Sequence, residues 1–254
     1  MDAAFTGYVD VAQVVLYIFW IFFFGLIWYI RRTDRREGYP VEYEAREAYG
    51  ATNFFWMAKP KEYILPHGHG SHFAPNEKRD DRPVAAERLG GPGAPFEPTG
   101  DPMVDAVGPA AYAQRDERPE LTREGDLLIV PMRVAEDYEI FKPSKDVRGM
   151  DVLANDRTRV GTVKDIWVDR ADQMVRYLEV ELEGGEGARL LPMFSALIRD
   201  DDTVTVASLK AEHFPKIPKL ANPDQVGVLE EDQIMAFYAG GRMYATTFGY
   251  GPLV

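Results

Sequence analysis

Two acids and an arginine at the turn between two expected strands are the residues best placed to do chemistry. The stretch VKDIWVDRADQMVRYLEVEL, residues 163–182, carries Asp169 and Asp172 at its turn and Arg176 shortly after it. Carboxylates beside a guanidinium either form a structural ion pair or hold and pass on protons. Arg176 is in register with the apolar residues of the second strand. We therefore expect it to face inward, with Asp169 or Asp172 as its partner.

The acids further along the second strand have a simpler expected role. Glu179 and Glu181 alternate with the apolar Leu178, Val180 and Leu182. This period of two is typical of a strand with one apolar and one polar face. We therefore expect both glutamates to lie on the solvated face of a small sheet.

Three of the four histidines form a second group with ligand chemistry. They lie within the run HGHGSH, at His67, His69 and His72. Imidazoles this close together bind a transition metal weakly, but their spacing matches no closed zinc site and the glycines loosen the loop. We expect a surface loop, with weak metal binding or uptake of protons from water as the alternatives.

Composition excludes several classes of function. The chain has 254 residues, a net charge of −12 and no cysteine. The negative charge argues against nucleic-acid binding, because phosphates are bound by clustered Lys and Arg. Disulfides, thiolate metal sites and thiol nucleophiles are excluded. The sequence also contains no GxSxG, phosphate-loop, GxGxxG or HExxH motif, so no soluble-enzyme chemistry is indicated.

One apolar segment decides the broad class of protein. Residues 11–30 (VAQVVLYIFWIFFFGLIWYI) are about 20 residues without a formal charge, the length of a transmembrane helix. A signal peptide would end in small residues, whereas Trp28 and Tyr29 stand here. No Lys or Arg precedes the span, so we expect the N-terminus outside and the remainder in the cytoplasm. The arginines that follow the span are Arg31, Arg32, Arg35 and Arg36.

The chain divides into four expected parts. These are the N-terminus with the transmembrane helix (1–36), an extended segment rich in Pro and Gly (37–120), a β-domain (121–225) and a C-terminal helix with a tail (226–254). Eleven of the 18 prolines fall in the second part, which disfavours long helices and central strands. Its aromatic residues are too many for a free tether, so we expect it to lie against the β-domain or a membrane-embedded partner. They include Tyr39, Tyr43, Phe54, Phe55, Trp56, Tyr63, Phe73 and Phe96.

Short strands at close spacing predict a small antiparallel barrel or curled sheet. The expected strands are 126–130, 159–169, 176–182, 189–192 and 203–206, with a glycine-rich turn at 184–187. Residues 230–239 begin with acids and are followed by Gly240 and Gly241, which are helix start and stop signals. The fold class is therefore a single N-terminal transmembrane helix, a mainly-β domain and a C-terminal helix. The buried stripe expected for this last helix is Ile234, Phe237 and Tyr238.

Eight short motifs after the span carry a family resemblance. They are RRTDRREGYP (31–40), YILPHG (63–68), PTGDPM (98–103), DAVGPAAYA (105–113), VGTVKDIWVD (160–169), RYLEVEL (176–182), LLPM (190–193) and EEDQIMAFYAGGRMYA (230–245). In this order and at this spacing, the chain resembles the H subunit of the purple-bacterial photosynthetic reaction centre over nearly its whole length. The β-domain also resembles the wider PRC-barrel module.

The resemblance implies a non-catalytic subunit that crosses the bacterial inner, intracytoplasmic photosynthetic membrane once, with a periplasmic N-terminus. In that family the H chain caps the quinone side of the L and M subunits, and proton paths to the secondary quinone run through it. Bacteriochlorophyll, bacteriopheophytin, the quinones and the non-haem iron are expected in the partner subunits, with no cofactor bound by this chain. Further candidate partners are membrane lipids, a cytochrome subunit and a light-harvesting ring.

The resemblance also assigns proton-transfer roles. The family's inner acid corresponds to Asp169 and its neighbouring arginine to Arg176. Its glutamate three residues after the inner acid is replaced by Asp172, which is one methylene shorter. A bridging water is then expected to complete the path.

The residues that take up protons differ from the family pattern. Family members carry an Asp and two His after a Pro-Glu-Leu motif, which is here Pro119–Leu121. Thr122, Glu124 and Asp126 occupy those places. We therefore expect Glu120, Glu124 and Asp126 to act at the surface, with lower unperturbed pKa values than histidine.

Two other functions stay open at this point. One is a membrane-anchored PRC-barrel adaptor that binds a different membrane protein. The other is a membrane-bound enzyme that uses the histidine loop and a metal.

Overall fold

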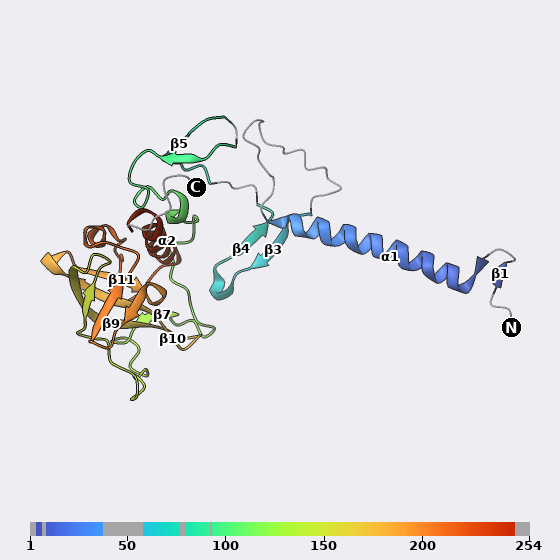
Figure 1. The fold of residues 1–254 in the computed structure, drawn as a ribbon. Coiled ribbons are helices and arrows are strands. Elements are labelled where there is room, and N and C mark those ends of the chain that lie inside the picture. Colours follow the sequence, from blue (N-terminus) through green and yellow to red (C-terminus); the bar gives the residue numbers. More distant parts are fainter. Residues whose placement is uncertain (1–3, 7–8, 38–57, 77–79, 92, 247–254) are drawn as a thin grey trace. The chain divides into compact units, whose positions relative to one another are not determined.

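The computed structural model describes residues 4–6, 9–37, 58–76, 80–91 and 93–246 (Figure 1). The chain divides into two compact units, Met1–Asp80 and Asp81–Val254. Five of the aromatic residues expected to hold the Pro-rich segment against another surface lie outside the described residues. These are Tyr39, Tyr43, Phe54, Phe55 and Trp56.

The first unit contains the long helix α1 (Val11–Thr33), which confirms the predicted apolar helix. Asp10 begins it, because its Oδ1 accepts a hydrogen bond from the Gln13 N–H at 2.7 Å. Among the described residues α1 is the one helix that is long and apolar enough to cross a membrane, and none of its apolar window is buried. The other elements of this unit are β1 (Ala4–Thr6), β2 (Val9–Asp10), η1 (Asp34–Arg36), β3 (Lys61–Ile64), η2 (Pro66–Gly68) and β4 (Ser71–Ala74).

The second unit is built on a seven-stranded sheet with the order β11-β10-β9-β8-β13-β12, in which β7 also pairs with β9. All these pairs are antiparallel except β8 with β13, which is parallel. The strands are β7 (Ile129–Pro131), β8 (Asp151–Leu153), β9 (Arg159–Asp169), β10 (Met174–Leu182), β11 (Ala188–Pro192), β12 (Ala196–Ile198) and β13 (Thr203–Val206). The mainly-β domain is therefore confirmed.

Shorter elements and one helix complete this unit. They are the hairpin of β5 (Ala86–Arg88) and β6 (Phe96–Pro98), the turns η3 (Gly108–Ala110), η4 (Glu183–Gly185), η5 (Met193–Ser195) and η6 (Ala211–Lys216), and α2 (Val228–Tyr244). Lys216 Nζ contacts Asp101 Oδ2 at 2.6 Å, so the later part of the Pro-rich segment lies against the β-domain.

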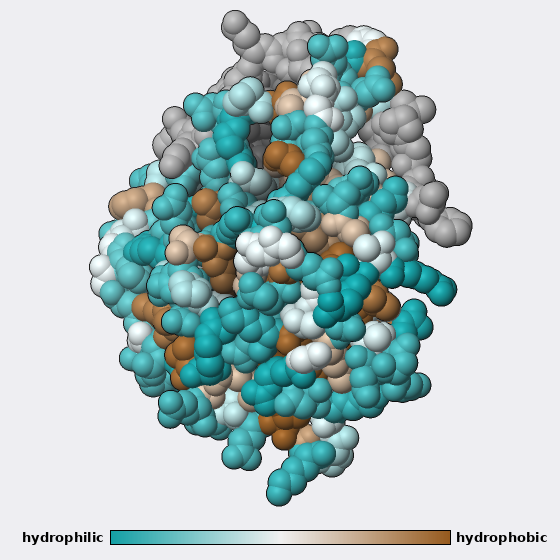
Figure 2. Space-filling model, turned by 90° about the vertical axis from the view of Figure 1, so that its left-hand side faces the viewer, coloured by the Kyte–Doolittle hydropathy of each residue, from teal (hydrophilic) through white to brown (hydrophobic). Residues whose placement is uncertain are grey.

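One continuous apolar core joins the sheet, η6 and α2. Trp167 and Leu178 are fully buried in the sheet, and Ile234, Phe237 and Tyr238 are buried on α2, which confirms the predicted stripe. On the face of this unit seen in Figure 2, apolar side chains appear as separate patches among hydrophilic ones. The chain thus buries its largest side chains in one place, at the junction of the sheet and α2.

A β-bulge in β10 changes the expected direction of Arg176. The pairing steps from Val175 opposite Val168 to Tyr177 opposite Trp167, so Arg176 is an extra residue without a cross-strand partner. The bulge interrupts the alternation, and Tyr177 and Leu178 are buried while Arg176 is exposed. The prediction that Arg176 faces inward with the apolar residues is therefore wrong.

The two glycines expected to end the last helix lie inside α2 instead. A Cβ on Gly240 would lie 2.6 Å from Ala110 Cβ, and one on Gly241 would overlap the Ser208 carbonyl oxygen. Their role is close packing of α2 against η3 and the chain after β13. The predicted helix end at residue 239 is corrected to Tyr244.

Replacing Gly240 by Ala is expected to lower the free energy of unfolding by about 1–3 kcal/mol, because an added methyl group overpacks the contact with Ala110. The higher helix propensity of Ala, which favours the folded state by roughly 1 kcal/mol relative to Gly, acts in the opposite direction. Denaturant unfolding of the full chain in detergent, followed by near-UV circular dichroism, measures the change. Gly91→Ala is the control, since a Cβ there meets nothing within 4 Å. Equal stability of the two variants would contradict the packing role.

Candidate functional site

Acidic residues from three separate segments line one open pocket of about 420 Å³. Asp169 and Arg176 come from the β9–β10 hairpin, Glu120 from the chain before β7, and Glu231 from the first turn of α2. We call these four residues, with Asp172 and Tyr177, the acid cluster. The fold therefore brings the predicted Asp169, Asp172, Arg176 and Glu120 together at one end of the sheet.

Asp169 is the innermost carboxylate of the pair at the turn, with only 2% of its side chain exposed. Its Oδ1 accepts the backbone N–H groups of Ala171 and Asp172 at 2.9 and 3.0 Å, a side-chain turn typical of Asp. Its Oδ2 accepts from Arg176 Nε at 3.0 Å. Asp169 thus shapes the turn and holds the arginine at the same time.

Arg176 bridges the buried and the exposed carboxylate. Arg176 Nη2 donates to Asp172 Oδ2 at 3.0 Å, and 58% of the Asp172 side chain is exposed. The predicted pairing of Arg176 with Asp169 or Asp172 is confirmed, with both acids as partners. The hydrogen bond from Arg176 to Asp169 raises the pKa of the guanidinium, so Arg176 stays charged and does not itself release a proton.

Glu231 and Tyr177 form the other half of the cluster. The Tyr177 hydroxyl donates to Glu231 Oε1 at 2.6 Å. Burial raises the pKa of Glu231, the Tyr177 hydrogen bond opposes this, and the nearby charge of Glu120 raises it further. The net result is a carboxyl with a pKa above its ordinary value. Burial, followed by the charge of Glu231, also raises the pKa of Tyr177, which therefore remains a donor.

Sequence reasoning missed both members of this pair. Glu231 was interpreted as a helix start signal, which it also is, since it lies in the first turn of α2. Tyr177 lies on the strand face that was expected to be solvated. Only the packing of α2 on the sheet shows that the two side chains meet.

The candidate residues for surface proton uptake are divided by the structure. Glu120 lines the acid pocket, whereas Glu124 and Asp126 lie on an exposed turn. A backbone ladder connects this turn to the hairpin, because Leu128 N–H donates to the Glu120 carbonyl at 2.9 Å and Arg170 N–H donates to the Leu128 carbonyl at 3.0 Å. The ladder holds Glu120 beside the hairpin and leaves the other two acids at its outer end.

The histidines belong to the first unit, at the turn of the β3–β4 hairpin. His67, His69 and His72 are exposed, and the ring centroids of the first two lie 6.3 Å apart. Across the part of the chain that the structure describes, no three His, Cys, Asp or Glu side chains are arranged to hold a metal ion. The exposure of the three histidines is that expected of a surface loop.

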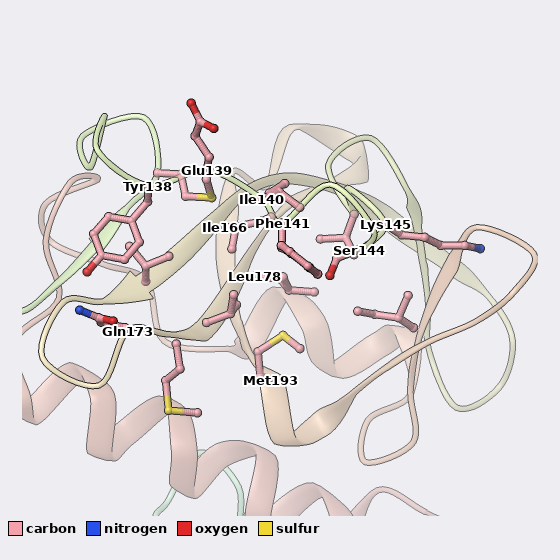
Figure 3. Close-up of a pocket in the computed structure, with 16 residues that line it drawn as sticks. Tyr138, Glu139, Ile140, Phe141, Ser144, Lys145, Ile166, Gln173, Leu178 and Met193 are labelled. Carbon is pink, nitrogen blue, oxygen red and sulfur yellow. The ribbon is translucent and has the colours of Figure 1, made fainter.

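An apolar cavity of about 250 Å³ adjoins the acid pocket, and Met174, Val175 and Met193 line both (Figure 3). The polar ends of Glu139 and Lys145 point away from its interior (Figure 3). The lining is mainly apolar, with the polar groups of Tyr138, Ser144 and Gln173 among it.

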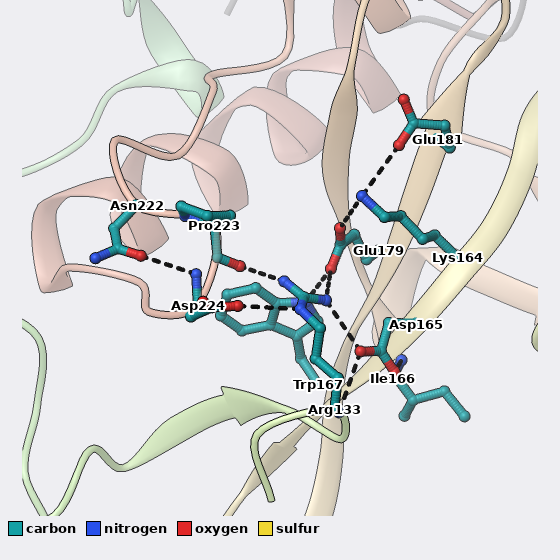
Figure 4. Close-up of polar contacts among 10 residues, drawn as sticks. All are labelled: Arg133, Lys164, Asp165, Ile166, Trp167, Glu179, Glu181, Asn222, Pro223 and Asp224. Carbon is teal, nitrogen blue, oxygen red and sulfur yellow. Dashed lines mark hydrogen bonds and ion pairs between the residues drawn. The ribbon is translucent and has the colours of Figure 1, made fainter.

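A second polar network corrects the prediction for Glu179, which is only 4% exposed (Figure 4). Glu179 lies directly opposite Asp165 in the β9–β10 pairing. Arg133 lies between them, with one nitrogen 2.9 Å from Asp165 Oδ2 and 2.5 Å from Glu179 Oε2. Trp167 Nε1 also donates to Glu179 Oε2 at 3.0 Å. We call these four residues the Arg133 network.

The face expected to be solvated is covered by segments from elsewhere in the chain. Arg133 follows β7, and it also contacts Asp224 at 3.0 Å and donates to the Pro223 carbonyl, both in the loop before α2. This loop and the segment after β7 exclude water from Glu179. Glu181, two residues further on, remains half-exposed and pairs with Lys164 at 3.3 Å, as expected for the solvated face.

Within the described residues, one long apolar helix precedes a mainly-β domain that carries an acid pocket, an arrangement that fits a membrane-anchored protein. Residues 3–134 match the photosynthetic reaction centre, H-chain N-terminal region, and residues 139–213 match the PRC-barrel domain. The first match covers more than half of the chain, so the chain belongs to the photosynthetic reaction centre H-chain family. It is a non-catalytic subunit of a photosynthetic reaction centre, with α1 as its single membrane anchor. This finding favours the reaction centre over an adaptor for a different membrane protein.

Glu179→Gln is expected to destabilise the protein by about 2–4 kcal/mol, because it removes the buried charge that Arg133 and Lys164 share and leaves Asp165 as the one buried carboxylate beside Arg133 among the described residues. Denaturant unfolding in detergent measures the change. Glu181→Gln is the matched control, since it removes the same charge from the same strand at a half-exposed site, where about 0–1 kcal/mol is expected. Equal losses in the two variants would show that the network does not stabilise the sheet.

The effect of Glu179 should also depend on pH. Burial raises the pKa of Glu179, but hydrogen bonds from Arg133, Trp167 and Lys164 outweigh it and hold the pKa below its ordinary value. A lowered pKa in the folded state contributes stability above the unfolded pKa of about 4.3. The stability difference between the protein and Glu179→Gln should therefore be full at pH 6 and shrink as the pH falls below about 4. A difference that grows on acidification would contradict this assignment.

Proposed function

We propose that this chain caps the cytoplasmic, quinone-bearing side of the L and M subunits and conducts protons through the acid cluster to the secondary quinone. The same contact stabilises the assembled complex and supports electron transfer between the two quinones. Pigments, quinones and iron are held by the partner subunits. The observation that carries the proposal is the arginine-bridged pair of one exposed and one buried carboxylate, Asp172 and Asp169.

The orientation of the chain supports this proposal. Arg31 and Arg32 lie in the last turn of α1, and Arg35 and Arg36 follow in η1. Positive residues at one end of a span favour its cytoplasmic side. The N-terminus is then periplasmic and the β-domain lies on the side where protons are taken up.

The chemical need for such a subunit follows from the reaction. A twice-reduced quinone concentrates negative charge in a buried site, where charge without solvent is costly and must be neutralised by protons. Open access of water would also expose reactive intermediates. A domain that covers the site and offers ionisable groups in sequence meets both requirements.

Each member of the acid cluster has a distinct part. Asp172 is exposed and exchanges protons with water, and Asp169 accepts them at the buried end. Arg176 is a positioning residue, because its raised pKa keeps it charged while it holds the two carboxylates on one guanidinium. Glu231 adds a proton-binding group, since its pKa is raised and its Tyr177 partner stays protonated. Ordered waters complete the connections between them.

Replacing Asp169 and Asp172 together by Asn in the assembled reaction centre should slow proton-coupled reduction of the secondary quinone on the order of tenfold or more. Initial charge separation should be unchanged, because it involves no proton. Flash-induced absorption changes and proton uptake by pH-indicator dyes measure the two steps. Asp146→Asn, at an exposed ion pair with Arg148, is the control. Unchanged uptake in the double variant would remove both acids from the path.

Glu231→Gln tests the proton-binding group separately. The raised pKa predicts a protonated carboxyl infrared band that persists above the ordinary glutamate pKa of about 4.3 and disappears in the variant. Glu230→Gln is the control, because Glu230 accepts the Gly227 and Ala221 N–H groups at 2.8 and 2.7 Å and lies outside the cluster. A band that survives in Glu231→Gln belongs to another residue.

A further inference from the structure

Three arginines line a pocket of about 660 Å³ on the other side of Phe194 from the acid cluster. Arg157 comes from the β8–β9 turn, Arg199 from the end of β12 and Arg242 from the last turn of α2. Asp201 is the one carboxylate that lines the pocket. In a chain of net charge −12, this local excess of positive charge is a focused site for an anion.

Within the described residues, these arginines form no direct ion pair, and only Arg199 acts on a carboxylate of the pocket, through the effect of its charge on Asp201. Among the described residues, no ion pair involves Arg157, Arg199 or Arg242, whereas Arg159, two residues away, pairs with Asp151 and Glu183. Arg199 uses only its Nε, which donates to Thr205 Oγ1 at 3.3 Å. Its terminal nitrogens are then available to a ligand.

Two further observations point into the same pocket. Ser195 lines it, and its buried hydroxyl has no hydrogen-bond partner among the described residues, which is costly unless a ligand or water supplies one. Arg157 adopts a φ of 63°, in the left-handed region that residues other than glycine seldom occupy. Asn155 secures this turn by donating to the Ala207 carbonyl at 2.5 Å. Such strain is typical of functional sites.

We propose that this arginine pocket binds a phosphate-bearing anion. The planar fork of a guanidinium matches phosphate oxygens in two parallel hydrogen bonds, and three arginines against one aspartate complement a dianion. The Ser195 hydroxyl supplies a neutral donor at the base. Phe194 and Leu197, which are 53% and 56% exposed, form an apolar wall of the same pocket. This wall suits the chains of a phospholipid, whereas inorganic phosphate would use the arginines alone.

Calorimetric titration of the full chain in a neutral detergent tests the proposal with two probes, inorganic phosphate and dihexanoyl phosphatidic acid. The double variant Arg157→Gln/Arg242→Gln is expected to bind both probes at least about tenfold more weakly, because each loses charge-assisted hydrogen bonds. Arg159→Gln is the control, since it removes one positive charge two residues from Arg157 and does not line the pocket. Its affinity should stay within about twofold of the unmodified chain.

Variants of the two wall residues, Phe194 and Leu197, distinguish a lipid headgroup from free phosphate. If phosphatidic acid binds more tightly than phosphate and the advantage is lost in Phe194→Ser/Leu197→Ser, the ligand is a lipid headgroup. If the two probes bind equally, it is a free phosphate group. Ser195→Ala should weaken either probe several-fold. Absence of binding by both probes, or equal losses in the double variant and Arg159→Gln, would overturn the proposal. This proposal does not depend on the proton-conducting role.

Discussion

Two buried carboxylates, Asp165 and Glu179, face each other across the central strand pair, and their mutual repulsion sets the main constraint on this domain. Arg133 removes it by donating to both, and it also reaches Asp224 in the loop before α2. Like charges at opposed sheet positions are otherwise destabilising. The register of β9 and β10, the course of the chain after β7 and the position of the loop before α2 therefore depend on one guanidinium. Four members of the acid cluster lie on the same β9–β10 hairpin, so their positions depend on the same register.

The two polar groups of this hairpin differ in how completely their charges are compensated. In the Arg133 network, Glu179 contacts Arg133 and Lys164 and accepts the Trp167 N–H, so its pKa is lowered and it holds no proton at neutral pH. In the acid cluster, Glu231 accepts a hydrogen bond from the Tyr177 phenol, and burial raises its pKa although this hydrogen bond and the charge of Arg176 oppose the shift. Full compensation makes a carboxylate structural, whereas partial compensation leaves it able to bind a proton. This contrast supports the proposed proton-binding role of Glu231.

The acid cluster depends on the close packing of α2. Gly240 and Gly241 allow the helix to approach Ala110 and Ser208, and this approach fixes the helix whose first turn carries Glu231. The last turn of the same helix carries Arg242 in the arginine pocket. One helix thus contributes a carboxyl to the acid cluster at its start and a cation to the arginine pocket at its end.

The sequence by itself determined the features that depend on local pattern. An uninterrupted apolar run is enough to specify α1, period-two alternation predicts the strand β10, and the spacing of acids around a turn predicts the Arg176 pairing. Ordered motifs identified the family. Only the tertiary structure shows which face of β10 is shielded from water. The segments that cover Glu179 lie about 45 residues before and after it in the sequence. The tertiary structure also decided that a bulge turns Arg176 outward, that Tyr177 meets Glu231, and that the paired glycines pack a helix instead of ending it. Burial and charge compensation are properties of the neighbours that a residue acquires on folding, and periodicity along one strand does not encode them.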